Sequence, residues 1–215
     1  YGSSIVHGTA ASRPGLIYQS ILSRRLNMDY INLGFSGKAK GEPVLVDYMA
    51  DMDMCLFVCD YDHNAPNPAH LAATHEPFFL RIREKQPNLP VIMLSRPYAV
   101  YGEDENARRD VVKKTYENAV ARGDKNVYFI DGEAFFKDCP DREKGFYLGD
   151  GCYTALTNMI LTHDESMVRK LIDDAFCTSF ITPTLVTCMD CSFMQEIAEY
   201  PLIFIMLLWI YLRHS

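Results

Sequence analysis

Apolar residues along the first 130 positions follow two alternating patterns. Short runs at residues 30–33, 54–59, 91–94 and 127–130, apolar except for Asn32, predict strands, and the continuous run at 54–59 is typical of a buried parallel strand. Residues 17–26, which carry apolar positions at helical spacing, predict a helix before the first of these runs, and residues 43–52, 76–86 and 104–122 predict helices between the runs. Strands that alternate with helices in this way indicate an α/β protein, with a parallel sheet covered on both faces.

The start of the first predicted helix has a recognisable pattern. Ser12 is placed as its cap and Pro14 lies in its first turn.

Polar positions elsewhere predict solvent-exposed segments. The charged positions 103–109 predict a solvated start for the last helix. His63, His70 and His75 are expected in a solvated loop and helix start.

The regular pattern stops near residue 150. We therefore expect one domain over residues 1–150, followed by a tail over 151–215 that is either divergent or altered by a reading-frame change, and that completes the domain only in part. The apolar run at residues 202–212 is shorter than the ~20 residues of a membrane span, so we expect a buried helix or strand there, not a membrane contact.

Composition narrows the function classes. With 215 residues, 48% of them apolar, the chain can bury the core of one α/β domain. A formal net charge of −7 argues against a nucleic-acid-binding surface, which needs clustered Lys and Arg. The seven cysteines suggest no disulfide framework. The chain has no initiator Met and no signal-like start, and we expect it to be a fragment that lacks the strand before its first loop.

Three blocks carry candidate chemistry. They read Tyr-Gly-Ser-Ser-Ile-Val-His-Gly at residues 1–8, Asn-Leu-Gly-Phe-Ser-Gly at 32–37 and Asp-Tyr-Asp-His-Asn-Ala-Pro at 60–66. Loops that follow parallel strands gather at one edge of a sheet, so a serine, a glycine turn and an asparagine can converge there. A nucleophile with two donors for a developing oxyanion is what acyl transfer requires.

These blocks, in this order, resemble those of the SGNH (GDSL-type) hydrolases, serine esterases and acylhydrolases on a flavodoxin-like sheet. The resemblance covers about residues 1–150 and implies a doubly wound parallel sheet in three α/β/α layers. It makes Ser4 the nucleophile, the Gly37 N–H an oxyanion donor, and Asn64 the oxyanion-hole asparagine. Ser3 stands where Asp is commoner in the family, and residues 61–64 depart from the family's Gly-x-Asn-Asp.

The base that should activate the serine is less clear. A serine hydroxyl needs a base, and the family's last block is Asp-x-x-His. Asp150 has the right spacing, but Tyr153 stands where His belongs; His163 has Ile160 at the Asp position. Either His163 serves with another acid such as Asp150, or the dyad is lost. Asp60-x-x-His63 matches the letters but lies in the third block, and we interpret that match as a coincidence.

The resemblance also implies a substrate and a context. It implies a short-chain carboxylic ester, of a small molecule or an acetylated carbohydrate, cleaved without cofactor or metal. Residues 11–15, 60–62 and 95–97 resemble a bacterial branch in which a β-sandwich domain precedes the hydrolase, and secretion or a periplasmic location would fit it. Arg13 and Arg96 are substrate contacts or loop braces. Two alternatives stay open: a non-catalytic ligand-binding relative or inactive fragment, and a redox or nucleotide-binding flavodoxin-like domain.

Overall fold

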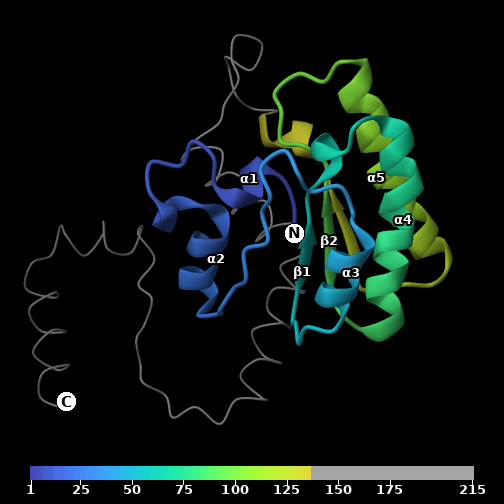
Figure 1. Cartoon of the computed structure of the whole chain (residues 1–215), viewed down its shortest axis with the longest axis horizontal. Helices are drawn as coiled ribbons and strands as arrows, with labels where there is room; N and C mark the ends of the chain where they lie inside the picture. Colours follow the sequence, from blue (N-terminus) through green and yellow to red (C-terminus); the bar gives the residue numbers. More distant parts are fainter. Residues whose placement is uncertain (137–215) are drawn as a thin grey trace, which may run out of the picture.

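A parallel sheet lies at the centre of residues 1–136, the part of the chain that the computed structural model describes (Figure 1). Its strands β1 (Phe57–Cys59), β2 (Val91–Leu94) and β3 (Val127–Ile130) are ordered β1-β2-β3. Phe57 pairs with Val91, and Val91 in turn pairs with Val127. Isolated parallel bridges join Gly2 to Gly34 and to Asp60, so the hydrogen-bonded array continues beyond β1.

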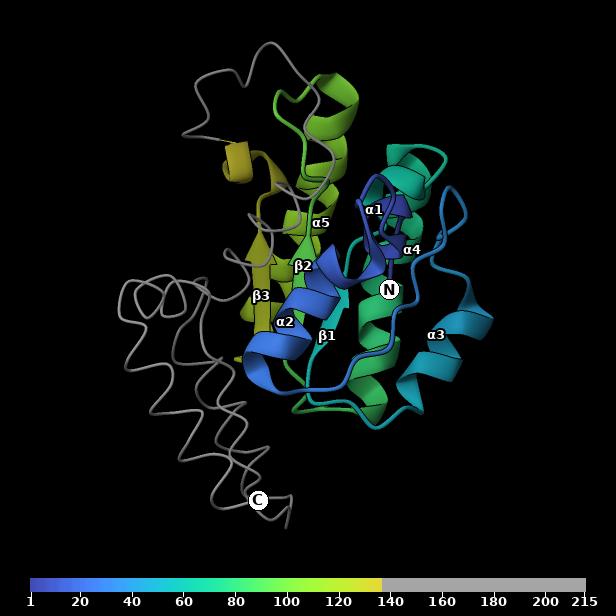
Figure 2. The same ribbon diagram turned by 90° about the vertical axis from the view of Figure 1, so that its left-hand side faces the viewer.

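Helices cover both faces of the sheet. On one side lie α3 (Pro43–Ala50), α4 (Pro68–Lys85) and α5 (Glu103–Ala121), and on the other lie α1 (Ser4–His7) and α2 (Tyr18–Leu26) (Figures 1 and 2). Three short 3-10 helices complete the elements: η1 (Pro14–Leu16), η2 (Asp62–Asn64) and η3 (Gly132–Phe136). This is the predicted three-layer α/β/α architecture, and the predicted fold class is confirmed.

The central strand shows why the core has two halves. All four residues of β2 are buried. Val91 and Met93 pack in the cluster under α3, α4 and α5, while Ile92 and Leu94 pack with α1 and α2. Successive side chains of a strand point to opposite faces, so a strand covered on both sides must be apolar at every position.

Several helices and strands differ in their bounds from those that the sequence predicts. The segment at 30–33 is not a strand; only its neighbour Gly34 makes a bridge. The helix predicted from residue 76 already begins at Pro68, where the Asn67 side chain accepts a hydrogen bond from the His70 N–H at 2.8 Å. Ser12 does not cap a helix: η1 precedes α2, and Ile17 is the N-cap of α2.

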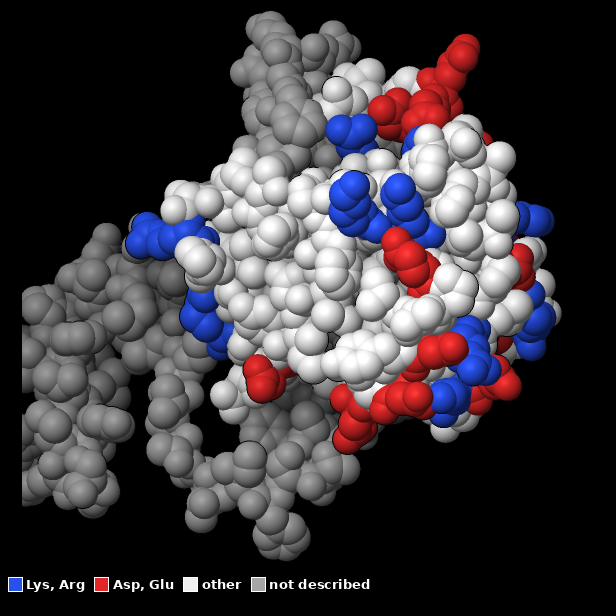
Figure 3. All heavy atoms as spheres, viewed as in Figure 1, with Lys and Arg blue, Asp and Glu red and all other residues white. Residues whose placement is uncertain are grey.

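Charged side chains of both signs gather over α3 and the adjoining part of α4 on the face seen in Figure 3. They include Arg81, which pairs with Asp47 at 2.6 Å, and Lys85, which pairs with Asp51. Within residues 1–136, none of the helices combines the length and the apolar character that a membrane span requires. The apolar run at 202–212 and the tail at 151–215 lie outside the described residues.

Candidate active site

Gly2 ties the first block to the second. Its N–H donates to the Leu33 carbonyl oxygen at 3.1 Å, and its own carbonyl oxygen accepts from the Phe35 N–H at 2.8 Å. A Cβ on Gly2 would lie 1.9 Å from the carbonyl oxygen of Asp60, and one on Gly34 would lie 2.2 Å from the His7 nitrogen. The absence of side chains at both positions therefore lets three backbone segments lie in contact.

The same segment is bound to the third block on its other side. The Ser3 N–H donates to the Asp60 carbonyl oxygen at 2.9 Å, and the Asp60 N–H donates to the Tyr1 carbonyl oxygen at 3.0 Å. Residues 1–3 thus lie between residues 33–35 and the end of β1, all running in parallel. The loops that follow these three segments leave the sheet at the same edge, as expected for an open parallel sheet.

Ser4 is the first residue of α1 and is partly exposed. Ser3, which is fully buried, caps this helix by accepting a hydrogen bond from the Ile5 N–H at 3.2 Å. Within residues 1–136 the Ser4 hydroxyl forms no hydrogen bond. Ser3 thus carries out the capping role, and the Ser4 hydroxyl is left available for chemistry.

Gly37 lies in a turn that leaves its N–H accessible. Its φ of +67° is in the left-handed region that favours glycine, and it is exposed. The turn is closed by the N–H groups of Lys38 and Ala39, which donate to the Phe35 carbonyl oxygen at 2.9 and 3.2 Å. The Gly37 N–H itself donates no hydrogen bond within the described residues.

Asn64 ends η2, which follows β1 along the chain. Its side-chain amide donates to the Phe35 carbonyl oxygen at 3.0 Å, and its main-chain N–H donates to the Tyr61 carbonyl oxygen at 3.0 Å. The structure therefore brings the loops of Ser4, Gly37 and Asn64 to one edge of the sheet. His163 and Asp150, the predicted base and its acid, lie outside the described residues.

Asp62 holds the η2 loop in place. It is 2% exposed, and it accepts hydrogen bonds from the His63 N–H at 2.7 Å and from the main-chain N–H of Arg96 at 2.9 Å. The His63 ring nitrogen Nδ1 lies 3.3 Å from the same carboxylate. These contacts join the loop after β1 to the loop after β2.

Arg108 of α5 supports the η2 loop through its main-chain carbonyl groups. Its Nη1 donates to the carbonyl oxygens of Asp62 and Ala65 at 2.7 and 2.8 Å, and its side chain is almost fully buried. The prediction of a solvated helix start at 103–109 is therefore wrong for Arg108. The guanidinium of Arg96 pairs with Glu105 at 3.3 Å and lies over the Tyr98 ring.

Asp60 is the unusual acid of this site. It is fully buried, and among residues 1–136 neither of its carboxylate oxygens has a hydrogen-bond partner. Burial raises its pKa to about 7; the charge of Asp62 acts in the same direction, and His63 opposes it. Asp60, Asp62 and His63 each present one ligand atom within 4.8 Å of the others, so within residues 1–136 they form a group that could hold a metal ion.

Comparison with known proteins identifies one family by both sequence and structure. A model of the GDSL-like lipase/acylhydrolase family matches residues 1–145. A protein described as a GDSL-like lipase from Bacteroides ovatus is 26% identical, with a TM-score of 0.68 over 79% of this chain and 52% of that one. No curated protein matches the chain.

Two further solved structures share the fold. The salicylyl-acyltransferase SsfX3 of a tetracycline biosynthetic pathway is 18% identical, with a TM-score of 0.62 over 83% of this chain and 54% of its own. A family two carbohydrate esterase from Clostridium thermocellum is 15% identical, with a TM-score of 0.58 over 75% of this chain and 62% of its own. The chain thus spans between half and two thirds of the length of these structural relatives.

Proposed function

Since the chain belongs to the GDSL-like lipase/acylhydrolase family, we propose that it is a serine hydrolase of short-chain carboxylic esters. The observation that carries the proposal is the hydrogen-bonded array around Gly2, which brings the loops of Ser4, Gly37 and Asn64 to one sheet edge. In this proposal Ser4 is the nucleophile. The N–H groups of Ser4 and Gly37 and the side chain of Asn64 bind the oxyanion.

The reaction follows from these roles. Ser4 Oγ attacks the ester carbonyl carbon while its proton passes to an imidazole, which we assign to His163 oriented by Asp150. The carbonyl oxygen becomes an oxyanion held by the three donors. Collapse of this intermediate expels the alcohol, which takes the proton from the imidazolium, and the acyl group stays on Ser4. Water then attacks the acyl-enzyme by the same steps and releases the acid.

We propose an acetylated carbohydrate as the substrate class. Two structural relatives support this: the family two carbohydrate esterase, which was solved with cellohexaose, and a two-domain esterase described as active on acetylated mannans. Both are distant relatives, at 15% and 14% identity. Their likeness to this chain therefore extends to the fold, and their names suggest the substrate class.

The test is hydrolysis of 4-nitrophenyl acetate by the wild-type protein and by Ser4→Ala. We expect Ser4→Ala to lose at least about 10³-fold in rate, because the nucleophile is removed. Ser36→Ala is the matched control, since Ser36 is exposed in the turn beside Gly37. Labelling of Ser4 by a fluorophosphonate provides a second readout that does not depend on complete turnover. Equal rates for wild type and Ser4→Ala would remove Ser4 from the mechanism.

A ligand-binding protein without turnover is the second candidate, and Tyr153 in the place of the family's histidine favours it. A phenol with a reference pKa of ~10 is a poor base at neutral pH. Saturable binding of an acetylated oligosaccharide without acetate release would support this candidate. Acetate release that His163→Ala abolishes would support the esterase instead.

A further inference from the structure

The chain that follows β1 brings three side chains with metal-binding atoms together. Asp60, Asp62 and His63 each present a carboxylate oxygen or a ring nitrogen, and these atoms all lie within 4.8 Å of one another. The three residues are close in sequence as well, because β1 ends at Cys59 and η2 begins at Asp62. A short stretch of chain therefore supplies two carboxylates and one imidazole to one small region.

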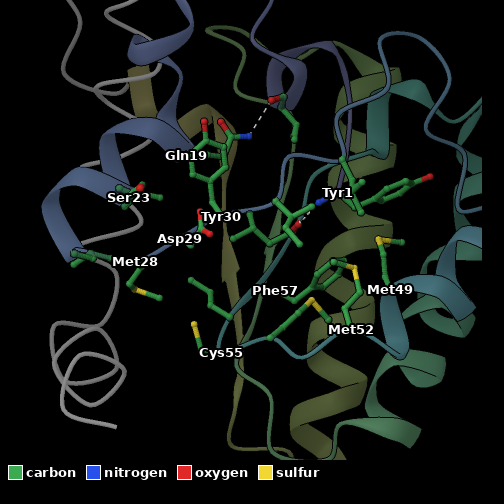
Figure 4. A pocket seen from close by; sticks show the side chains of 18 of the residues that line it. Tyr1, Gln19, Ser23, Met28, Asp29, Tyr30, Met49, Met52, Cys55 and Phe57 are labelled. Carbon is green, nitrogen blue, oxygen red and sulfur yellow. Dashed lines mark hydrogen bonds between the residues drawn. The ribbon is translucent and has the colours of Figure 1, made fainter. Parts of the chain in front are cut away.

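Asp60 directs an unpaired carboxylate at the other two ligands. Its side chain is buried, and neither oxygen has a hydrogen-bond partner among residues 1–136. The cavity beneath α2 does not bring solvent to it, because the described residues that line this cavity, among them Gln19, Tyr30 and Cys55, do not include Asp60 (Figure 4). A buried carboxylate without a partner is costly in free energy, so Asp60 requires a proton or a cation.

Arg96 does not fill this role. Its guanidinium pairs with Glu105 at 3.3 Å and lies over the Tyr98 ring, 4.3 Å from the ring centroid. Its main-chain N–H donates to the Asp62 carboxylate at 2.9 Å and not to Asp60. Within residues 1–136, no cationic side chain is therefore bonded to Asp60.

Asp62 and His63 are already spaced as two ligands of a tetrahedral ion. Oδ1 of Asp62 lies 3.3 Å from Nδ1 of His63. Zinc binds carboxylate oxygen and imidazole nitrogen at about 2.1 Å in a tetrahedral arrangement, which separates two ligand atoms by about 3.4 Å. Asp60 joins them as the third ligand after a side-chain adjustment on the order of 1 Å, since its ligand atom lies within 4.8 Å of theirs.

Hydrogen bonds hold the Asp62 carboxylate in a fixed orientation. Oδ1 accepts from the His63 N–H at 2.7 Å, and Oδ2 accepts from the Arg96 N–H at 2.9 Å. Each carboxylate oxygen has two lone pairs, so Oδ1 can accept this hydrogen bond and also bind an ion. Ligating carboxylates in metal sites are commonly oriented by such hydrogen bonds.

We propose that Asp60, Asp62 and His63 bind one divalent transition-metal ion of the zinc class, where β1 meets η2. Two carboxylates balance the two positive charges of the ion, and the imidazole favours zinc over Mg²⁺ and Ca²⁺, which prefer oxygen ligands. In the metal-free protein a proton neutralises Asp60, and the ion takes its place. The ion stabilises the loop that carries Asn64 and takes no part in ester hydrolysis, so the site is independent of the proposed function.

The test is a titration of the full chain with cobalt(II), after treatment with EDTA and dialysis, followed by displacement with zinc(II). Asp60→Asn and His63→Gln each replace one ligand by a neutral amide of similar shape. We expect each variant to bind at least about 10²-fold more weakly than the wild type. The thermal midpoint of the wild type should rise by several degrees in excess zinc(II), and the rise should be lost in both variants.

The seven cysteines of the chain could also bind these ions, and they must be distinguished from the proposed site. Thiolate ligands give cobalt(II) an intense ultraviolet band, which binding by carboxylates and imidazole does not produce. We expect the cobalt(II) spectrum that is lost in Asp60→Asn and His63→Gln to lack this band.

Two substitutions serve as matched controls. His7→Gln and Asp53→Asn change exposed side chains outside the cluster, and both variants should bind cobalt(II) as tightly as the wild type. Thermal unfolding in EDTA shows whether each variant is folded; should Asp60→Asn fail to fold, His63→Gln decides alone, since its side chain is partly exposed. The proposal is overturned if the wild type binds cobalt(II) only with the thiolate band. It is also overturned if His63→Gln binds as tightly as His7→Gln.

Discussion

The side-chain amide of Asn64 donates a hydrogen bond of 3.0 Å to the main-chain carbonyl oxygen of Phe35. The bond joins the loop after β1 to the turn that contains Gly37, so two of the proposed oxyanion donors are held relative to each other. A side-chain amide has two N–H groups, and one is used here. The second remains to bind a developing negative charge, in an orientation that the first has already set.

Replacing Asn64 by Ala should therefore lower kcat by about 10²- to 10³-fold, which corresponds to about 3–4 kcal/mol of transition-state stabilisation. The measurement is hydrolysis of 4-nitrophenyl acetate, together with thermal unfolding. Asn67→Ala is the control, because Asn67 caps α4 and its loss should reduce stability by about 1 kcal/mol without affecting the chemistry. A fall in kcat of the same size in Asn67→Ala would contradict the role of Asn64.

Two glycines in the second block should respond very differently to a methyl group. A Cβ at Gly34 would lie 2.2 Å from the main-chain nitrogen of His7, so Gly34→Ala should destabilise the fold by about 3 kcal/mol or more. A Cβ at Gly37 meets no atom of the described residues within 4 Å, so the φ of +67° is what opposes alanine there, at a cost of about 1–2 kcal/mol. Urea unfolding of both variants measures the difference. Similar losses in the two variants would show that the close contact at Gly34 is not maintained in solution.

Asp60 should make the protein less stable as the pH rises. Its pKa of about 7 in the folded state lies above the ordinary 3.8. Between these values the folded state retains a proton that the unfolded state has lost, so the free energy of unfolding falls from about pH 4 to pH 7. The contribution is on the order of a few kcal/mol.

Asp60→Asn removes this titration while it preserves the shape of the side chain. We expect the variant to gain stability over the wild type as the pH rises, with the difference levelling off above about pH 7. Urea unfolding at several pH values gives that difference directly. A constant difference between the two proteins from pH 4 to pH 8 would mean that Asp60 is not protonated in the folded state.

His75 should act in the opposite direction. It is buried, its ring stacks on Tyr61, and its Nδ1 lies 2.9 Å from the Thr115 hydroxyl, which donates to the Val111 carbonyl oxygen. Burial lowers the pKa of His75 to about 4 from the ordinary 6.5. As the pH falls below 6.5 the unfolded state takes up a proton that the folded state does not, so about 3 kcal/mol of stability is lost by pH 4.

His75→Gln should reduce this loss, because glutamine can still donate to Thr115 and does not titrate. The measurement is urea unfolding of the wild type and the variant between pH 4 and pH 7. Parallel curves for the two proteins would show that His75 takes up a proton equally well in both states. The expectation of a solvated histidine at this position was wrong, since Tyr61 and Thr115 of α5, which both lie outside its own helix, pack against His75.

The strands β2 and β3 have the bounds that the apolar pattern predicts, because both are central or well covered and so need apolar residues along their whole length. The apolar run at 54–59 is longer than β1. Residues 54–56 line a cavity beneath α2, and Phe57–Cys59 pair with β2. The early start of α4 could have been recognised: Asn67 followed by Pro68 is a frequent helix start.

The candidate site was predictable only in part. Gly37 and Asn64 follow strand-like runs, and the family resemblance places Ser4 in a loop of the same kind, so their common edge could be expected from topology. The support that Arg108 gives to the η2 loop could not be predicted from the sequence. It depends on a contact across 46 positions of the chain, and a charged residue near a helix start usually faces water. The cluster of Asp60, Asp62 and His63 did leave a signal, in the Asp-x-x-His spacing.

The place of residues 1–3 between two later segments has a consequence for biosynthesis. These residues leave the ribosome before both of their partners, and Asp60 must be synthesised before the array around Gly2 can close. A nascent chain that stops short of β1 therefore carries its serine in an unformed turn. The proposed nucleophile, although made before both of its partner segments, gains its geometry only when more than fifty further residues have emerged.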